Sequence, residues 1–179
     1  MWIDQTTQHV FKYHQEIRDA FPNTSFPSVM TDEVLASVGV VPVIQMTPPA
    51  FDRRYQKVVE NAPAMVNGAW EQQWSVVPLS ATEQQDVAAQ IQKEIVDATQ
   101  QRLDVFVKTR NYDGILSACT YASSTVLKFR TEGQYCVDAR DNTWATLYSI
   151  LAEVQAGTRP MPSGYAEIEL LLPTLTWPA

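Results

Sequence analysis

The sequence predicts an α+β fold, with a small β-rich N-terminal module over residues 1–79 and a helical C-terminal module over residues 80–179. Seven of the eleven prolines precede residue 80, in a stretch that is typical of short strands, turns and short helices. An Asn-Gly dipeptide at residues 67–68 lies between two apolar runs, as in a β-hairpin. Two long stretches after residue 80 have helical periodicity.

Short elements are expected before residue 45. They are a strand over residues 10–13, a helix over residues 14–21, a second helix after Thr31 through Ala36, and a strand over residues 40–44. Pro22 ends the first helix, and Thr31 is a suitable N-cap for the second. Pro42 suggests that the last strand lies at a sheet edge, because proline has no amide hydrogen to donate.

The Asn67-Gly68 dipeptide predicts a two-residue type I′ turn, because both positions must adopt a positive φ. Val66 then pairs with Ala69, and the register follows outward. On one face it predicts the opposed pairs Met65 with Trp70, Asn61 with Trp74, and Val59 with Val76. On the other face it predicts Ala64 with Glu71, Ala62 with Gln73, and Glu60 with Ser75. Pro63 marks the first strand as an edge strand.

One face of this hairpin is aromatic and the other is mostly polar, so the aromatic face is expected to cover something. Trp70 and Trp74 can form a stacking platform for a ligand, or they can pack on the first helix or on a partner chain. Packing is the favoured interpretation, since large aromatics serve most often in cores and interfaces. Met65 and Val76 share this face, so these four residues are candidates for a partner interface.

Ser80 and Glu83 have the spacing of a capping box, which predicts a long helix that extends to about Arg110. Its narrow apolar stripe consists of Val87, Ile91, Ile95, Ala98 and Val105, and the polar Gln84 and Arg102 fall at other stripe positions. Such a stripe on a polar helix predicts a helix–helix seam. Pairing within the chain and coiled-coil self-association both remain open, with a trimer as the favoured oligomer. Ile91 and Ile95 are therefore further partner-interface candidates.

A second long helix is expected after a break at residues 112–114 and a short apolar piece over residues 115–121. Ser123 or Ser124 is expected to cap it, and it extends to about Ala156. Its inward face is expected to consist of Phe129, Val137, Trp144, Leu147, Tyr148, Leu151 and Val154.

Glycines punctuate this last part of the chain. Gly133 interrupts the second long helix at a cost of about 1 kcal/mol. Gly157 is placed to end that helix, with Pro160 beyond it. A final short helix is expected over residues 165–171.

Residue types that often carry catalysis or bind metals form no recognisable pattern, so we expect no enzyme, no metal site and no cofactor. His9 and His14 are the two histidines, and a strand-to-helix break between them disfavours a shared metal ion. Cys119 is expected to be a small packing residue between helices rather than a thiol nucleophile. Neither a Gly-rich dinucleotide motif nor a Walker loop occurs.

Two pairs of carboxylates have spacings that chemistry can use. Asp138 and Asp141 lie three apart on one helix face, but Arg140 beside them favours a solvated, salt-bridged face over a divalent-metal site. Glu60 and Glu71 share the polar face of the predicted hairpin but do not oppose each other. Nothing in the sequence lines a sugar cleft around them, which disfavours a glycosidase pair.

The net charge of −7 and the pI near 4.7 disfavour binding to nucleic acid or to an anionic membrane, since both require clustered Lys and Arg. The first residues lack the basic and apolar regions of a secretory signal. The longest apolar stretches are far shorter than the roughly 20 residues that span a bilayer. Synthesis in the cytosol without export is the expectation.

Several phrases along the chain are characteristic. In the N-terminal half they are residues 22–27 (PNTSFP), 35–43 (LASVGVVPV), 49–52 (PAFD), 66–70 (VNGAW) and 73–74 (QW). In the C-terminal half they are residues 110–122 (RNYDGILSACTYA), 139–141 (ARD) with Trp144, 153–157 (EVQAG) and 172–178 (LPTLTWP). With these phrases, most of the chain resembles a family of phage and prophage tail proteins that are found near, or as part of, tail-fibre modules.

The resemblance implies a role in a phage tail or its fibres. The leading expectation is a structural tail component, attached to the fibre or baseplate, and the alternative is a tail-fibre assembly chaperone that is not retained in the virion. Other tail or tail-fibre proteins are the implied partners, and no catalytic residues are implied. The implied location is the virion tail, and the host cytoplasm during assembly.

Overall fold

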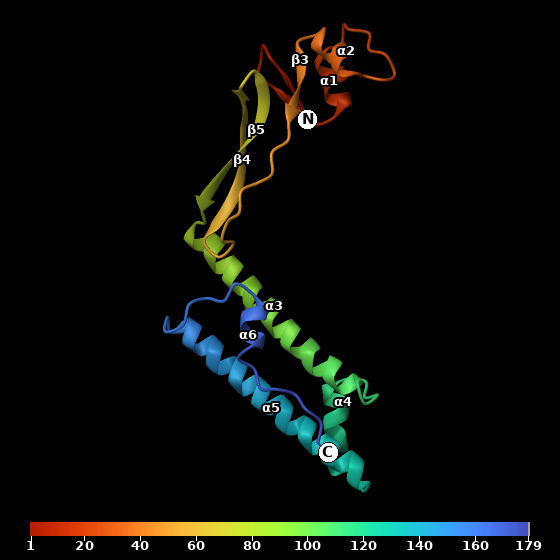
Figure 1. Cartoon of the computed structure of the whole chain (residues 1–179), viewed down its shortest axis with the longest axis vertical. Helices are drawn as coiled ribbons and strands as arrows, with labels where there is room; N and C mark the ends of the chain where they lie inside the picture. The colour runs from red at the N-terminus through yellow and green to blue at the C-terminus, as the bar shows by residue number, and fades with distance from the viewer. Residues whose placement is uncertain (179) are drawn as a thin grey trace. The chain divides into compact units, whose positions relative to one another are not determined.

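The computed structural model describes residues 1–178, and the chain divides after Pro78 into two compact units. The first unit, Met1–Pro78, contains a five-stranded sheet and two short helices, and the second is built from helices (Figure 1). This arrangement confirms the α+β class predicted from the sequence. The division lies one residue from the predicted boundary between residues 79 and 80.

The sheet of the first unit has the strand order β2-β1-β3-β5-β4. The elements of this unit are β1 (Trp2–Asp4), β2 (Val10–Phe11), α1 (His14–Ala20), α2 (Asp32–Ala36), β3 (Val40–Ile44), β4 (Gln56–Val66) and β5 (Ala69–Pro78). Paired strands are antiparallel except β3 and β5, which are parallel. The elements expected before residue 45 are all present, although the strand expected over residues 10–13 is only two residues long.

β1 is a strand that sequence patterning did not predict. Its three residues are too few to show an alternating pattern. It forms because both of its sides are paired: Ile3 lies opposite Val10 of β2 and opposite Val41 of β3. Ile3 is almost completely buried there, so tertiary pairing rather than local propensity determines this strand.

β3 lies between β1 and β5, so the prediction that Pro42 marks an edge strand is wrong. The Val43 amide donates to the Met1 carbonyl oxygen, and successive amides of a strand point to opposite sides. The backbone nitrogen of Pro42 therefore points away from β1. Pairing with β5 begins only at Val43, beyond the proline, so the missing N–H of Pro42 is not needed there.

The core of the first unit lies where α1 and α2 cover the start of the sheet. It consists of Phe11, Ile17, Met30, Leu35 and Val40, with partly buried Trp2, Phe21, Phe26 and Val38 packed against it. Every one of these residues precedes β4. The hairpin formed by β4 and β5 thus contributes nothing to this core.

The second unit contains α3 (Ala81–Lys108), α4 (Ile115–Thr120), the 3-10 helix η1 (Tyr121–Ser123), α5 (Leu127–Gln155) and α6 (Tyr165–Glu169). The capping box of α3 is confirmed: the Ser80 hydroxyl accepts from the Glu83 amide, and the Glu83 carboxylate accepts from the Ser80 amide. Gly157 follows α5 with a φ of +72°, as expected of a helix-terminating glycine.

The buried line of α3 departs from the predicted stripe in its second half. It consists of Ile91, Ile95, Thr99, Leu103 and Val107, whereas Ala98 is only partly buried and Val105 is 55% exposed. A spacing of four residues drifts around an α-helix by about 40° per step. The buried line moves around α3 because the helix contacts different elements along its length. Ile91 and Ile95 pack against α5 and α6, and Leu103 packs against α4. The two long helices therefore pack together within one chain.

The start of α5 also differs from expectation. Its N-cap is Val126, which makes no side-chain cap bond, so the prediction that Ser123 or Ser124 caps this helix is wrong. Ser123 is still part of η1, and the Ser124 hydroxyl accepts from the Val126 amide instead. Both serines thus belong to local turns that precede the first residue of α5.

The buried face of α5 consists mostly of smaller side chains than the sequence predicts. It consists of Glu132, Gly133, Cys136, Ala139, Thr143, Leu147 and Ile150. Leu147 is buried as expected, but Phe129 and Tyr148 are 40% and 62% exposed. Small residues dominate because α4 and η1 approach closely: a Cβ atom on Gly133 would lie 2.3 Å from the backbone nitrogen of Ala122. Phe129 and Tyr148 thus lie outside this face, whereas Trp144 is half-buried and packs against both core clusters.

Candidate functional site

The β4–β5 hairpin carries four of the six residues that the sequence singled out as interface candidates. Asn67 and Gly68 adopt φ of 49° and 86°, which confirms the predicted turn. Val66 pairs with Ala69, Met65 with Trp70, and Ala64 with Glu71, all as predicted. The first half of the predicted register is therefore correct.

Beyond Ala64 the register shifts by one residue, so the predicted partners of Trp74 and Val76 are wrong. Trp74 lies opposite Glu60 rather than Asn61, and Val76 lies opposite Val58 rather than Val59. The shift falls between Asn61 and Ala64, where two residues of β4, one of them Pro63, face a single residue of β5. Such a β-bulge accommodates a proline that cannot donate to the ladder.

The shift changes which side chains share a face. We define the Trp face of the hairpin by the residues Val58, Glu60, Met65, Trp70, Gln72, Trp74 and Val76. Glu60 thus joins the tryptophans, while Glu71 lies on the other face. The two glutamates are not on a common face, which corrects the predicted placement and removes the geometry of a carboxylate pair.

Hydrogen bonds fix the middle of the Trp face. The Trp74 indole N–H donates to the Met46 carbonyl oxygen at 2.8 Å, and the Met46 amide donates to Gln72 Oε1 at 3.2 Å. Gln72 Nε2 in turn donates to Glu60 Oε1 at 2.6 Å. These bonds hold the extended segment after β3 along β5. Met46 is a residue that the sequence did not single out, since a backbone carbonyl group leaves no signal in composition.

No residue of β4 or β5 is buried, although the two strands together span 21 positions. Met65 is 51% exposed and Val76 is 37% exposed, and the two tryptophans are half-buried. The exposed apolar side chains of the hairpin and of the segment before it are Ile44, Met46, Phe51, Tyr55, Val59, Met65 and Val76. Two-stranded ribbons are at best marginally stable in water, so this hairpin gains little stability from burial within its own strands.

The Trp70 indole has a polar atom that differs from that of Trp74 in its contacts. Its Nε1 atom is buried, and it has no hydrogen-bond partner within residues 1–178. A buried donor without an acceptor costs about 1–3 kcal/mol. The tryptophan side chains therefore differ: Trp74 is anchored through its nitrogen, whereas Trp70 is held by packing alone.

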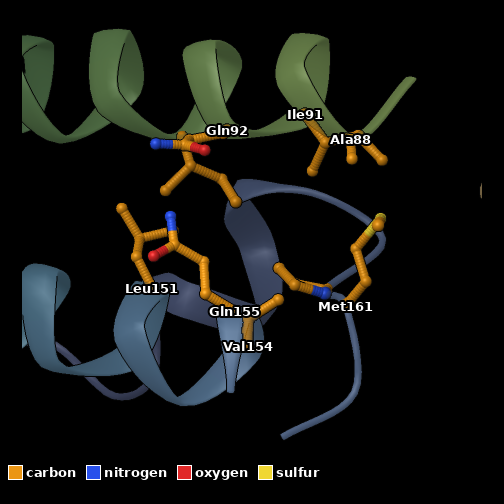
Figure 2. A pocket seen from close by; sticks show the side chains of 9 residues that line it. Ala88, Ile91, Gln92, Leu151, Val154, Gln155 and Met161 are labelled. Atoms are coloured by element: carbon orange, nitrogen blue, oxygen red, sulfur yellow. The ribbon is translucent and has the colours of Figure 1, made fainter. Parts of the chain in front are cut away.

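The other two candidates, Ile91 and Ile95, lie on α3 and are 2% and 0% exposed. They line an apolar cavity of about 220 Å³ in the second unit. Its lining is Ala88, Ile91, Gln92, Ile95, Leu151, Val154, Gln155, Met161 and Pro162. Figure 2 shows Met161 facing Ala88 and Ile91, with Gln155 reaching up from α5 below Gln92. The volume is below the roughly 300 Å³ of typical ligand pockets, so it suits a single apolar side chain.

A buried ionic cluster in the second unit was not foreseen from the sequence. Glu132 is 3% exposed, and it accepts hydrogen bonds from Arg110 and, at 2.7 Å, from the Tyr112 hydroxyl. Burial opposes ionisation of Glu132, but the bonds from Tyr112 and Arg110 outweigh it and hold the pKa of the carboxyl below its ordinary value. Arg110 and Tyr112 lie 22 and 20 positions before Glu132, so no local spacing rule predicts their contacts with it.

The same cluster anchors the end of the chain. The Trp177 ring stacks on Phe106 at 4.5 Å, and the Arg110 guanidinium lies 4.8 Å from the Trp177 ring centre. The Thr176 amide donates to the Tyr135 hydroxyl, and Arg102 donates to the Pro173 carbonyl oxygen. Because Arg110 pairs with Glu132 and also lies over the Trp177 ring, the arrangement is that of a structural clasp.

The titratable candidates are engaged in local contacts. Cys119 is half-buried beside the fully buried Cys136, and burial raises the pKa of both thiols, that of Cys136 to about 12. Such a shift makes a thiolate nucleophile unfavourable. Asp141 pairs with Arg140, and Asp138 accepts from Gln134, so the structure does not bring the two aspartates to a common ligand.

Each histidine lies against an aromatic ring: His9 against Phe11 at 4.7 Å, and His14 against Trp2 at 4.3 Å. Within residues 1–178, no group of three or more His, Cys, Asp or Glu side chains is placed to hold a metal ion. None of the described helices is long and apolar enough to cross a membrane.

Comparison with known proteins found no matching protein-family model, no matching curated protein and no matching solved structure.

Proposed function

We propose that this chain is a structural component of a phage tail, attached to the tail fibre or baseplate and acting through protein–protein contacts. The observation that carries the proposal is the β4–β5 hairpin, which has no buried residue and exposes apolar side chains on both faces. A ribbon of this kind gains stability when another chain covers it. The phage-tail setting comes from the resemblance of the sequence phrases.

The partners in this proposal are other tail or tail-fibre proteins and further copies of the chain. Its location would be the virion tail, reached from the host cytoplasm during assembly. The stripe of α3 left pairing within the chain and self-association both open, and Ile91 and Ile95 are covered by α5 and α6 of the same chain. We therefore base the contact surface on the hairpin.

A tail-fibre assembly chaperone that leaves before the virion is complete is the second candidate. The observation that favours it is the polar anchoring of the Trp face, where Trp74 and Gln72 hold the Met46 segment in place. These bonds fix the positions of the Trp74 and Gln72 side chains within one chain, and a pre-organised surface binds a partner with little backbone movement.

Quantitative mass spectrometry of purified virions tests the proposal. A structural component is expected at a copy number that matches the fibre or baseplate proteins. If the chain is present in infected-cell lysates but absent from virions, the structural role is refuted and the chaperone role is favoured. Pull-down of fibre proteins from lysate with the wild-type chain and with Trp74→Ala then locates the contact.

A further inference from the structure

β4 is the longer of the two edge strands of the sheet in the described part of the chain. β4 and β2 are the two edge strands of the sheet, and β4 has 11 residues whereas β2 has two. Backbone N–H and C=O groups along such an edge can pair with another strand. Any partner that pairs here extends the sheet and adds a third strand beside the β4–β5 hairpin, which has no buried residue.

The edge has two halves with different properties. The half near the turn contains the bulge and Pro63, which interrupt the ladder and protect an edge from pairing. The half from Gln56 to Asn61 is regular: each residue lies opposite one residue of β5 in an unbroken register. Pairing with another strand is therefore confined to this regular half.

We infer that the regular half of β4 pairs antiparallel with β4 of a second copy, around a twofold axis at Val58. In this register Val58 opposes Val58 of the second copy, Lys57 opposes Val59, and Gln56 opposes Glu60. The five residues from Gln56 to Glu60 use the regular half of the edge except its last residue, Asn61, which adjoins the bulge. The product is one continuous sheet with the strand order β5-β4-β4-β5.

The side chains of the Trp face are complementary in this register. Val76 lies opposite Val58 within one chain, so the twofold axis makes an unbroken row of four valines across the two copies. Gln56 Oε1 accepts from the Asp52 amide, which leaves its NH₂ group to donate to Glu60 of the second copy. Glu60 already accepts from an amide of the same type, that of Gln72.

Other registers fit less well. Directly opposed residues must lie on the same face, so the axis can move only to another residue and not between residues. An axis at Val59 would set the Glu60 carboxylate against Val58 and end the valine row. An axis at Glu60 would oppose two carboxylates directly, which is unfavourable.

Disulfide trapping tests this register, because a single cysteine on the axis meets its own copy. Directly opposed residues have Cα atoms about 4.5–5.5 Å apart, within the range that a disulfide bridges. In full-length Val58→Cys, oxidised glutathione should take up the two electrons as two thiols become one disulfide. The expected product is a covalent dimer at twice 20.1 kDa on a non-reducing gel.

Gln56→Cys is the matched control on the same face. Its two copies would be offset by four residues, or about 13 Å along the strands, which is too far for a disulfide. The wild-type chain controls for Cys119 and Cys136. A several-fold larger dimer fraction for Val58→Cys than for Gln56→Cys is the expected result. Equal fractions, or preferential trapping of Val59→Cys, would overturn the inference.

Hydrogen exchange of the unmodified protein provides a test that does not depend on any variant. The amides of residues 56–60 should exchange several-fold more slowly as the protein concentration rises, while those of residues 61–64 at the bulge should not change. Exchange that is independent of concentration over residues 56–60 would equally overturn the inference.

Discussion

Gly133 shows how one missing side chain determines the packing of the second unit. Its position within a predicted helix predicts a loss of helix stability of about 1 kcal/mol relative to alanine. In the structure it is buried in α5 where the backbone of η1 passes, so the position excludes any side chain. The glycine is thus required by the close approach of Tyr121 and Ala122, which lie twelve and eleven positions before it in the sequence.

Gly133→Ala is expected to lower the free energy of unfolding by about 3 kcal/mol. The added Cβ would lie 2.3 Å from the Ala122 nitrogen and 2.4 Å from the Tyr121 carbonyl carbon, so two backbone segments must separate. Urea unfolding followed by circular dichroism measures the change. Gly157→Ala is the control, because no atom lies within 4 Å there and only its positive φ resists alanine, at about 1 kcal/mol. Equal losses for the two variants would contradict the close approach.

Tyr112 is expected to make the protein sensitive to alkaline pH. Burial, followed by the hydrogen bond to Glu132 and its charge, raises the pKa of Tyr112 from 10.0 to about 12. Between these values the folded chain keeps a proton that the unfolded chain has lost. The stabilisation is therefore complete below pH 10 and is lost as the pH rises through 12, at about 1.4 kcal/mol per unit.

Tyr112→Phe isolates this contribution. Its free energy of unfolding should fall less steeply between pH 10 and 12 than that of the wild-type chain. Chemical denaturation at a series of pH values gives the two slopes. Parallel slopes would show that Tyr112 ionises alike in the folded and unfolded chains.

At the scale of elements, local signals predicted the ends of several helices and the central turn. Asn67 and Gly68 locate the hairpin turn, and Ser80 with Glu83 locates the start of α3, because these residues form their structures with near neighbours. The bulge at Pro63 and the strand β1 depend on distant partners. No local pattern could place them.

The face that each long helix buries was predicted less well, for the same reason. A helix in contact with one partner keeps a fixed stripe, but α3 changes its neighbours along its length, and its buried line moves from Ile95 to Thr99 rather than to Ala98. On α5, Tyr148 stacks on Trp144 at 5.8 Å while remaining 62% exposed. Hydrophobic periodicity alone cannot distinguish such surface stacking from burial.

Ser80→Ala is expected to destabilise the second unit by about 1 kcal/mol, because the Glu83 amide loses its acceptor at the start of α3. Thermal or urea unfolding of the full chain measures the loss. Ser123→Ala is the matched control: Ser123 was a candidate cap of α5 but does not cap it, so its loss should stay within about 0.5 kcal/mol. A larger effect at Ser123 than at Ser80 would contradict the assigned helix starts.

At the scale of the whole molecule, the two units differ in how they are stabilised. The helical unit has two core clusters, and Arg110 and Phe106 hold Trp177 against it. The first unit has one small core around α1 and α2, and its hairpin extends beyond that core with no buried residue. The candidate interface residues Met65, Trp70, Trp74 and Val76 lie on that hairpin. Sequence patterning identified them because the alternation of residues around the Asn67-Gly68 turn places aromatic and apolar side chains on one face.

The central proposal is that another chain completes the hairpin, and the mass of the purified protein in solution tests this proposal most directly. Light scattering coupled to size exclusion, with the full wild-type chain at micromolar concentration, should give twice the 20.1 kDa mass of one chain. Dilution should shift the population toward single chains, since the contact involves one strand from each copy. A mass of 20.1 kDa across the whole concentration range would contradict the account.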